Sequence, residues 1–338
     1  MRRFFTRLYG NGKVKMRLGE AILSKRQNHA LLIAGPDGSG KNTLAIEIAA
    51  ALNCENKSAN ERPLPCGTCN TCRRIYEGNY TDVKRLRRES SKATIGVEEL
   101  RVFREDMFLS STESEHKIYI IEEADRMTAN AQNALLKVLE EPPRSVMIIM
   151  LCEESDKILT TIKSRAQLIP MQRFMPSEIL DYLTSAKLVN ISDSRRVEED
   201  IMSADGRIGR ALEILESPEE VEADRRLALS VISALKPSAP YLELYTAVMA
   251  LPQKRVELSA ALEEISLALS DLIKVKFSES AVLTFFGNRD DALSVAEGLS
   301  AKKLLAVYDA VRDAADDNAK NANISALITC LGAKIKLI

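Results

Sequence analysis

The chain has 338 residues, of which 28% are charged and 46% hydrophobic, and its formal net charge is −1. This length allows two or three domains with an ample core, and the composition is that of an ordinary globular protein. The near balance of charges excludes a protein that bulk electrostatics drives onto DNA, so any nucleic-acid contact is local or is supplied by partners. The longest apolar run, residues 146–152, is too short to cross a membrane.

Three short apolar runs, residues 30–34, 118–121 and 146–151, predict strands that are buried on both faces. Helical patterns follow the first two runs, at residues 42–52 and after a capping Thr128. Strands that alternate with helices build a parallel sheet with helices on both faces, and nucleotides bind at the carboxyl ends of such strands. The first part of the chain is therefore predicted to be an α/β domain.

The strand signal disappears after residue 171, and the rest of the chain is predicted to be all-α. Residues 176–188 and 195–215 have helical patterns, and later helices are broken near residues 237–240, 252 and 287. We expect an α/β nucleotide-binding-type domain over residues 1–171, a small helical domain over 172–217 and a larger helical domain over 218–338.

A phosphate loop follows the first predicted strand. Glycines let its backbone curl around phosphate groups, and a lysine places a cation between the outer phosphates. The usual next residue carries a hydroxyl that binds magnesium, but an asparagine stands there and a threonine comes one position late. The expected binding residues are Gly35, Gly38, Gly40, Lys41, Asn42 and Thr43. A working nucleotide site and a loop retained for its structure alone both stay open.

Two glutamates, Glu122 and Glu123, end the second predicted strand. A nucleotide-hydrolysing enzyme normally has an aspartate that holds magnesium and then a glutamate that activates water. The longer side chain of Glu122 displaces its carboxylate, whereas Glu123 remains a potential base. A working site and a solvated acidic strand end are both compatible with this pair.

A cluster of cysteines follows the phosphate-loop helix, and its spacing predicts a metal centre. The four thiolates of Cys54, Cys66, Cys69 and Cys72 can complete a tetrahedron around zinc. All-cysteine ligation leaves no open position, so the expected zinc is structural and needs neither histidine. The isolated Cys152 and Cys330 are expected to be buried thiols. This use of cysteine, with no signal-peptide pattern at the basic N-terminus, predicts a reducing, cytoplasmic environment.

Two basic features have both a functional and a structural interpretation. Arg165 follows the third predicted strand, where an arginine finger can reach the γ-phosphate of a neighbouring subunit, although a lone arginine is usually a surface cation. The basic run at residues 84–88 is interpreted mainly as a solvated strand or loop edge, with direct DNA contact as the minor alternative.

Taken together, these motifs resemble the bacterial replicative clamp loaders, a branch of the AAA+ ATPases. The most specific match is the run QNALLKVLEEPP at residues 132–143. The other residues that carry the resemblance are 29–30, 35–41, 51–54, 65–73, 95–97, 122–127, 164–165 and 205–212. The resemblance covers residues 1–215 well, whereas the last third of the chain matches only in length and helical character.

The resemblance implies an AAA+ P-loop domain with a zinc module at residues 54–72, a helical lid and a C-terminal helical collar that holds a pentamer. Its implied partners are gamma/tau and delta subunits, the sliding clamp and primed DNA, with Arg165 serving a neighbour's ATP site. Within the family the chain resembles the delta-prime branch more than the ATP-hydrolysing gamma/tau branch.

The departures from the family's active site fall at Asn42, Glu122 and Gly209. Gly209 stands where the lid normally has a nucleotide-sensing arginine, and Arg210 is one position off. These departures predict weak or absent ATPase activity, so ATP and magnesium remain uncertain cofactors. The alternatives are an active gamma/tau-type ATPase and an unrelated P-loop nucleotide kinase. The cysteine module and the absence of a recognisable acceptor-binding motif argue against the kinase.

Overall fold

The computed structural model describes residues 2–59, 61–89, 92, 94–109, 113–143, 145–188 and 194–338. The chain divides into two compact units. One comprises Met1–Leu188 with Gly206–Gly209, and the other comprises Val189–Asp205 with Arg210–Ile338. Within the described residues, no helix is both long and apolar enough to span a membrane.

A five-stranded parallel sheet forms the centre of the first unit, with the strand order β2-β3-β4-β1-β5. The three predicted strands are confirmed as β1 (Ala30–Ala34), β3 (Lys117–Ile121) and β4 (Val146–Cys152). The edge strands β2 (Val83–Leu86) and β5 (Gln167–Pro170) have no buried apolar run, because an edge strand is only partly covered. Their sequences therefore lack the signal that identified the central strands.

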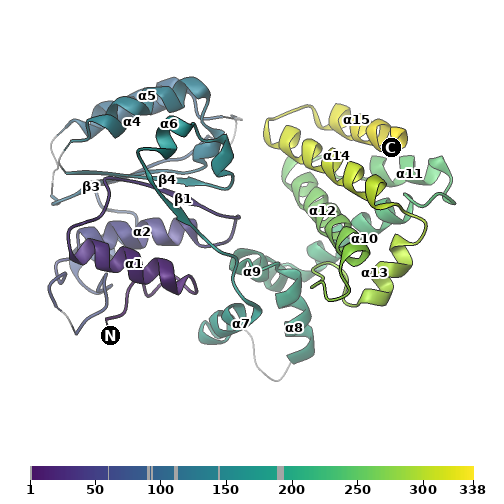
Figure 1. Ribbon diagram of the computed structural model, residues 1–338, viewed down its shortest axis with the longest axis horizontal. Coiled ribbons are helices and arrows are strands. Elements are labelled where there is room, and N and C mark those ends of the chain that lie inside the picture. The colour runs from purple at the N-terminus through teal and green to yellow at the C-terminus, as the bar shows by residue number, and fades with distance from the viewer. Residues whose placement is uncertain are drawn as a thin grey trace. The chain divides into compact units, whose positions relative to one another are not determined.

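Helices cover both faces of this sheet (Figure 1). On one face lie α1 (Gly12–Leu23), α2 (Lys41–Leu52) and α3 (Asn70–Tyr76), and on the other lie α4 (Val97–Met107), α5 (Ala129–Glu140) and α6 (Thr160–Lys163). Alternate residues of β1 enter the two cores, with Leu31 and Ile33 facing α2 and Leu32 facing α5. The predicted cap of α5 is confirmed, since the Thr128 side chain accepts a hydrogen bond from the N–H of Ala131 at 3.2 Å.

Three short helices follow the sheet: α7 (Pro176–Ser185), α8 (Ser194–Ser203) and α9 (Ile208–Glu216). The sequence predicted one helix over residues 195–215, but the structure has two. The break falls at Asp205 and Gly206, which adopt left-handed φ angles of 51° and 71°. A Cβ on Gly206 would lie 2.7 Å from the Cβ of Arg173, so a side chain is excluded there.

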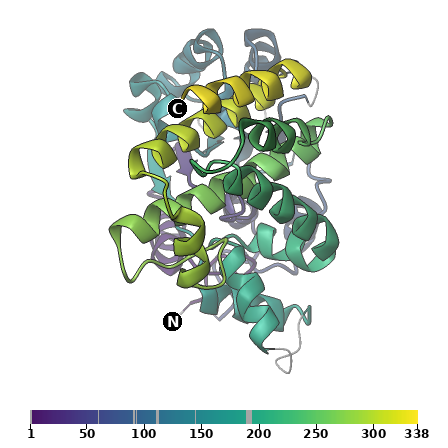
Figure 2. The same cartoon turned by 90° about the vertical axis from the view of Figure 1, so that its right-hand side faces the viewer.

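The second unit continues with six further helices (Figure 2). The long α12 (Arg255–Phe277) packs between α10 (Pro218–Ser233) and α14 (Ala301–Ala319), and its apolar residues form the centre of the core. The remaining helices are α11 (Tyr241–Met249), α13 (Arg289–Ala296) and α15 (Ile324–Leu337). The predicted breaks are confirmed, whereas the division of the helices into separate lid and collar domains remains a prediction.

Candidate functional site

The phosphate loop connects β1 to α2 at the carboxyl end of the sheet. Gly38 and Gly40 have left-handed φ angles of 69° and 88°, which side chains disfavour. Nζ of Lys41 donates hydrogen bonds to the carbonyl oxygens of Gly35 and Pro36, at 2.8 and 2.9 Å. Asn42 and Thr43 lie in the first turn of α2. The strand–loop–helix geometry predicted for this segment is therefore present.

A small cleft of 130 Å³ opens beside the loop. Small-molecule sites usually have about 300–1,000 Å³, so this cleft is small for a nucleotide. Its lining contains six carboxylates and only two cations, which disfavours a triphosphate. The residues that line it are Asp37, Lys41, Asn42, Glu122, Glu123, Asp125, Arg126, Leu151, Cys152, Glu153 and Glu154.

Glu122 lies in this cleft, but arginines hold both of its carboxylate oxygens. Arg85 belongs to the neighbouring strand β2, and Arg87 comes directly after that strand. Nε of Arg85 donates to Oε1 of Glu122 at 2.7 Å, and Nε of Arg87 donates to Oε2 at 3.0 Å. Nη2 of Arg85 lies 2.6 Å from the same Oε1 and donates to Oδ1 of Asn42 at 3.4 Å. The Glu122 carboxylate is 8% exposed, whereas the Arg85 and Arg87 side chains are 40% and 67% exposed, so water reaches the arginine side of both ion pairs.

Glu123, the candidate base, is engaged in the same way. Nε of Arg88 lies 2.9 Å from its Oε2, and Nη2 of Arg88 lies 3.3 Å from its Oε1. Lys84 completes the pattern with an ion pair to Asp106 at 2.6 Å. The interpretation of residues 84–88 as a solvated strand edge is confirmed, since β2 is an edge strand and Arg85 and Arg87 are exposed. In addition, each of these basic side chains pairs with a carboxylate of the same unit.

The segment Gly206–Gly209 packs on the phosphate loop. A Cβ on Gly38 would lie 3.0 Å from the Cβ of Arg207, and a Cβ on Gly209 would lie 3.7 Å from the Cα of Gly38. Arg207, which sequence reasoning did not select, is thus the arginine that lies against the loop. Arg210 belongs to the other unit, where its buried guanidinium pairs with Glu213 and Glu264.

Arg165 lies just after α6, at the surface of the first unit. Its Nη1 donates to the carbonyl oxygen of Thr161 at 3.0 Å and to Oγ of Ser164 at 3.2 Å. Its Nη2 lies 2.8 Å from Oε1 of Glu140, the last residue of α5. The side chain is 36% exposed, so the guanidinium is accessible although it is held by its own chain.

The structure brings the four predicted thiols together. The sulfur atoms of Cys54, Cys66, Cys69 and Cys72 all lie within 4.8 Å of one another, and all four residues are buried. A tetrahedral zinc ion about 2.3 Å from each sulfur separates the sulfurs by about 3.8 Å. The observed 4.0 Å between the sulfurs of Cys66 and Cys72 fits this spacing. The cluster can therefore hold a metal ion of this size.

Hydrogen bonds around the cluster favour thiolates. The N–H groups of Cys66, Cys69 and Cys72 donate to the sulfurs of Cys54, Cys66 and Cys69, respectively, at 3.4–3.5 Å. A hydrogen bond from the Cys72 thiol, aided by the Cys66 N–H, lowers the pKa of Cys54 to about 5.

The two cysteines outside the cluster differ from each other. Cys152 is buried, as expected, whereas Cys330 is exposed at the surface of α15, contrary to expectation.

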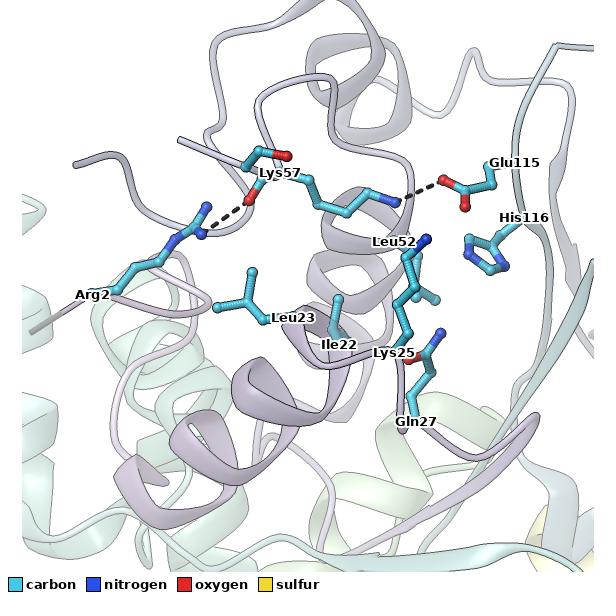
Figure 3. Close-up of a pocket in the computed structure, with 10 residues that line it drawn as sticks. Arg2, Ile22, Leu23, Lys25, Gln27, Leu52, Lys57, Glu115 and His116 are labelled. Carbon is cyan, nitrogen blue, oxygen red and sulfur yellow. Dashed lines mark hydrogen bonds and ion pairs between the residues drawn. The ribbon is translucent and has the colours of Figure 1, made fainter. Parts of the chain in front are cut away.

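A second pocket, of 320 Å³, lies at the opposite edge of the sheet (Figure 3). Gln27 precedes β1 and His116 precedes β3, which places the pocket at the amino ends of the strands. Nζ of Lys57 lies 3.0 Å from Oε2 of Glu115, and Arg2 donates to the Lys57 carbonyl oxygen. Burial lowers the pKa of His116. This pocket is therefore separate from the phosphate-loop site, which lies at the carboxyl ends of the strands.

Residues 10–175 match the model of a protein family described as DNA polymerase III, delta subunit. This part of the chain is therefore similar to that family. Among known relatives, DNA polymerase III subunit tau of Bacillus subtilis is 32% identical over 267 residues, covering 78% of this chain and 45% of the relative. Subunit delta' of the same organism is 36% identical over 171 residues, covering 51% of this chain and 50% of the relative. The chain thus spans about half the length of these relatives.

The fold is also similar to that of a solved structure. A DNA polymerase III gamma-subunit-related protein from Thermotoga maritima superposes with a TM-score of 0.51, covering 95% of this chain and 98% of that chain. The two sequences are 17% identical, so the likeness concerns the fold alone. The predicted architecture, a parallel-sheet P-loop domain followed by helices, is confirmed.

Proposed function

We propose that this chain is a delta-prime-type subunit of the DNA polymerase III clamp loader. In this role it assembles with gamma/tau and delta subunits that load the sliding clamp onto primed DNA, and it does not hydrolyse ATP itself. The family match of residues 10–175 supports the general assignment. The finer assignment depends on whether Glu122 and Glu123, the two acidic residues that follow β3, are free to take part in hydrolysis.

The observation that carries the proposal is the pairing of both acidic residues with arginines. In a hydrolysing site the first carboxylate holds magnesium and the second activates the attacking water. Here Glu122 is held by Arg85 and Arg87, and Glu123 by Arg88. Because the arginines already engage these carboxylate oxygens, magnesium or a water molecule can bind there only if a guanidinium is displaced.

Two further features support a structural and assisting role. The four cysteines provide a closed ligand set for a structural zinc ion, which fits their buried, compact arrangement. The partly exposed Arg165 is available to contribute positive charge to the γ-phosphate of a neighbouring subunit. Both features serve an assembly without requiring turnover by this chain.

The second candidate is a gamma/tau-type subunit with its own ATPase activity. It is favoured by the similarity to the Bacillus subtilis tau subunit, which extends over 78% of this chain, whereas the similarity to delta' covers 51%. The two candidates differ in one measurable property, the ATP turnover of the isolated chain.

The deciding experiment measures steady-state ATP turnover of the chain alone and after assembly with gamma/tau and delta subunits, the sliding clamp and primed DNA. We expect no turnover above background alone, and turnover by the complete assembly. Steady turnover by the isolated chain that is abolished by Lys41→Ala would transfer the assignment to the gamma/tau type. Failure to assemble with any clamp-loader subunit would contradict both candidates.

A further inference from the structure

One guanidinium connects the two residues at which the cleft departs from a hydrolysing P-loop site. Nη2 of Arg85 lies 2.6 Å from Oε1 of Glu122 and 3.4 Å from Oδ1 of Asn42. In a hydrolysing P-loop site, the residue after the lysine and the acidic residue after the strand hold magnesium between them. Here the same two positions hold a side-chain cation between them.

Magnesium does not fit this arrangement. The ion requires oxygen ligands at about 2.0–2.1 Å in near-octahedral geometry. An ion bound to both Oε1 of Glu122 and Oδ1 of Asn42 would lie between these atoms, where Nη2 of Arg85 lies. The second carboxylate oxygen of Glu122 is also occupied, by Nε of Arg87 at 3.0 Å.

The arginines also offset the negative charge of the two glutamates that would attract a divalent cation. The ends of β2 and β3 bring together three arginines, Arg85, Arg87 and Arg88, and two glutamates, Glu122 and Glu123. Their sum is +1, whereas the two glutamates without arginines would give −2, although four further carboxylates line the same cleft. The Glu122 carboxylate itself is 8% exposed, although its arginine partners are 40% and 67% exposed.

We propose that the Arg85 guanidinium takes the place of Mg²⁺ between Glu122 and Asn42 and so excludes the ion from this cleft. Any polyphosphate that the phosphate loop and Lys41 hold in spite of the acidic lining is therefore held without a divalent cation. The inference concerns the cleft itself, so it does not rest on the clamp-loader assignment.

The test is made on the isolated full-length chain, with a fluorescent ATP analogue titrated in excess Mg²⁺ and in excess EDTA. The quantity compared is the gain in affinity that Mg²⁺ produces. Wild-type protein should show no gain. Arg85→Ala combined with Asn42→Thr, which restores a hydroxyl, should show a gain of about tenfold or more, because the metal can then bridge protein and phosphates.

Three matched variants isolate the role of Arg85. Asn42→Thr alone and Arg87→Ala combined with Asn42→Thr keep the Arg85 guanidinium and should show no Mg²⁺-dependent gain. If thermal unfolding shows that the Arg85→Ala, Asn42→Thr double variant is misfolded, the Arg85→Gln, Asn42→Thr double variant takes its place. Glutamine is neutral and can still donate a hydrogen bond to Glu122. Electron paramagnetic resonance of Mn²⁺ with tripolyphosphate should detect bound ion only in the variants that lack Arg85.

Each result bears on the proposal. A clear Mg²⁺-dependent gain in the wild-type protein would overturn it, because the cleft would then accept the metal beside Arg85. The absence of a gain and of bound Mn²⁺ in both folded variants without Arg85 would also overturn it, since another feature would then exclude the ion. A gain in the Arg87 variant equal to that in the Arg85 variants would show that net charge, and not the position of Arg85, is responsible.

Discussion

Nη2 of Arg165 lies 2.8 Å from Oε1 of Glu140, so the candidate arginine finger is held by a carboxylate of its own chain. Glu140 ends α5 and Arg165 follows α6, and the two helices pack against each other. To reach a phosphate on a neighbouring subunit, the guanidinium must exchange this carboxylate for the phosphate oxygens. Exposed ion pairs of this kind are worth about 0.2–1 kcal/mol, so the exchange costs little.

Loss of the arginine should therefore be far more serious than loss of its carboxylate. Arg165→Ala should leave the chain folded and assembled, and should lower turnover at the ATP site it serves by ~10³-fold. Glu140→Gln should retain turnover and change it by no more than about fivefold, which corresponds to about 1 kcal/mol. DNA-stimulated ATPase activity of the assembled clamp loader measures both effects. Lys163→Ala, which removes a nearby cation of α6, is the control, and an Arg165→Ala assembly as active as wild type would refute the finger role.

The cysteine cluster should hold about one zinc ion per chain. Elemental analysis of the purified protein measures the content directly. Cys72→Ser should lose the metal and lower the unfolding temperature, since this residue is fully buried within the cluster. Cys330→Ser removes an exposed thiol outside the cluster and should keep the metal. Metal-free wild-type protein with native stability and four freely titrating cluster thiols would contradict the zinc assignment.

Glu47 should make stability depend on pH. Burial raises the pKa of this α2 carboxyl, which accepts hydrogen bonds from the Tyr76 hydroxyl and the Arg7 N–H. A raised pKa in the folded state stabilises the protein below the unfolded value, near 4.5, and this stabilisation is lost as pH rises through the folded value. Glu47→Gln keeps an acceptor for Tyr76 but does not ionise.

The free energy of unfolding of Glu47→Gln relative to wild type should therefore increase as pH rises from about 4.5 and then level off. The increase amounts to about 1.4 kcal/mol for each unit by which the pKa is raised. Urea unfolding of both proteins at the same series of pH values measures it, so that any effect on the metal centre cancels. A flat difference for Glu47→Gln would show that ionisation of Glu47 is not coupled to folding.

The buried pair of Arg210 and Glu264 should be important for the stability of the helical unit. Their side chains are 7% and 4% exposed, and Arg225 lies 3.7 Å from the second oxygen of Glu264. Arg210→Met leaves the carboxylate with this one distant partner and should cost about 3 kcal/mol, at the lower end of the range for broken buried pairs. Adding Glu264→Gln should recover part of the loss.

Chemical denaturation of the full chain measures these changes in stability. Lys334→Met, which breaks an exposed pair with Asp313, should change stability by less than about 0.5 kcal/mol. Equal effects of the Arg210 and Lys334 variants would mean that burial adds nothing to the importance of the pair.

Local patterns in the sequence were sufficient for the centre of the fold and for two motifs. Strands β1, β3 and β4 are continuous apolar runs, because both faces of a central parallel strand are buried. The phosphate loop and three of the four cysteines lie close together along the chain, so their spacing alone indicates how they can be arranged. The break at Asp205 and Gly206 was missed, because the helical pattern of apolar residues continues across it.

The state of the candidate site was decided by tertiary structure. The sequence established that Glu122 ends a strand and that Asn42 follows the loop lysine, but Arg85 stands 37 residues before Glu122 and 43 after Asn42. Only the pairing of β2 with β3 brings this arginine to both residues. Strand order depends on contacts between distant segments, which a local pattern of residues does not encode. The sequence alone therefore determined a P-loop fold with a four-cysteine cluster, whereas the neighbouring strand decided which cation its acidic residues hold.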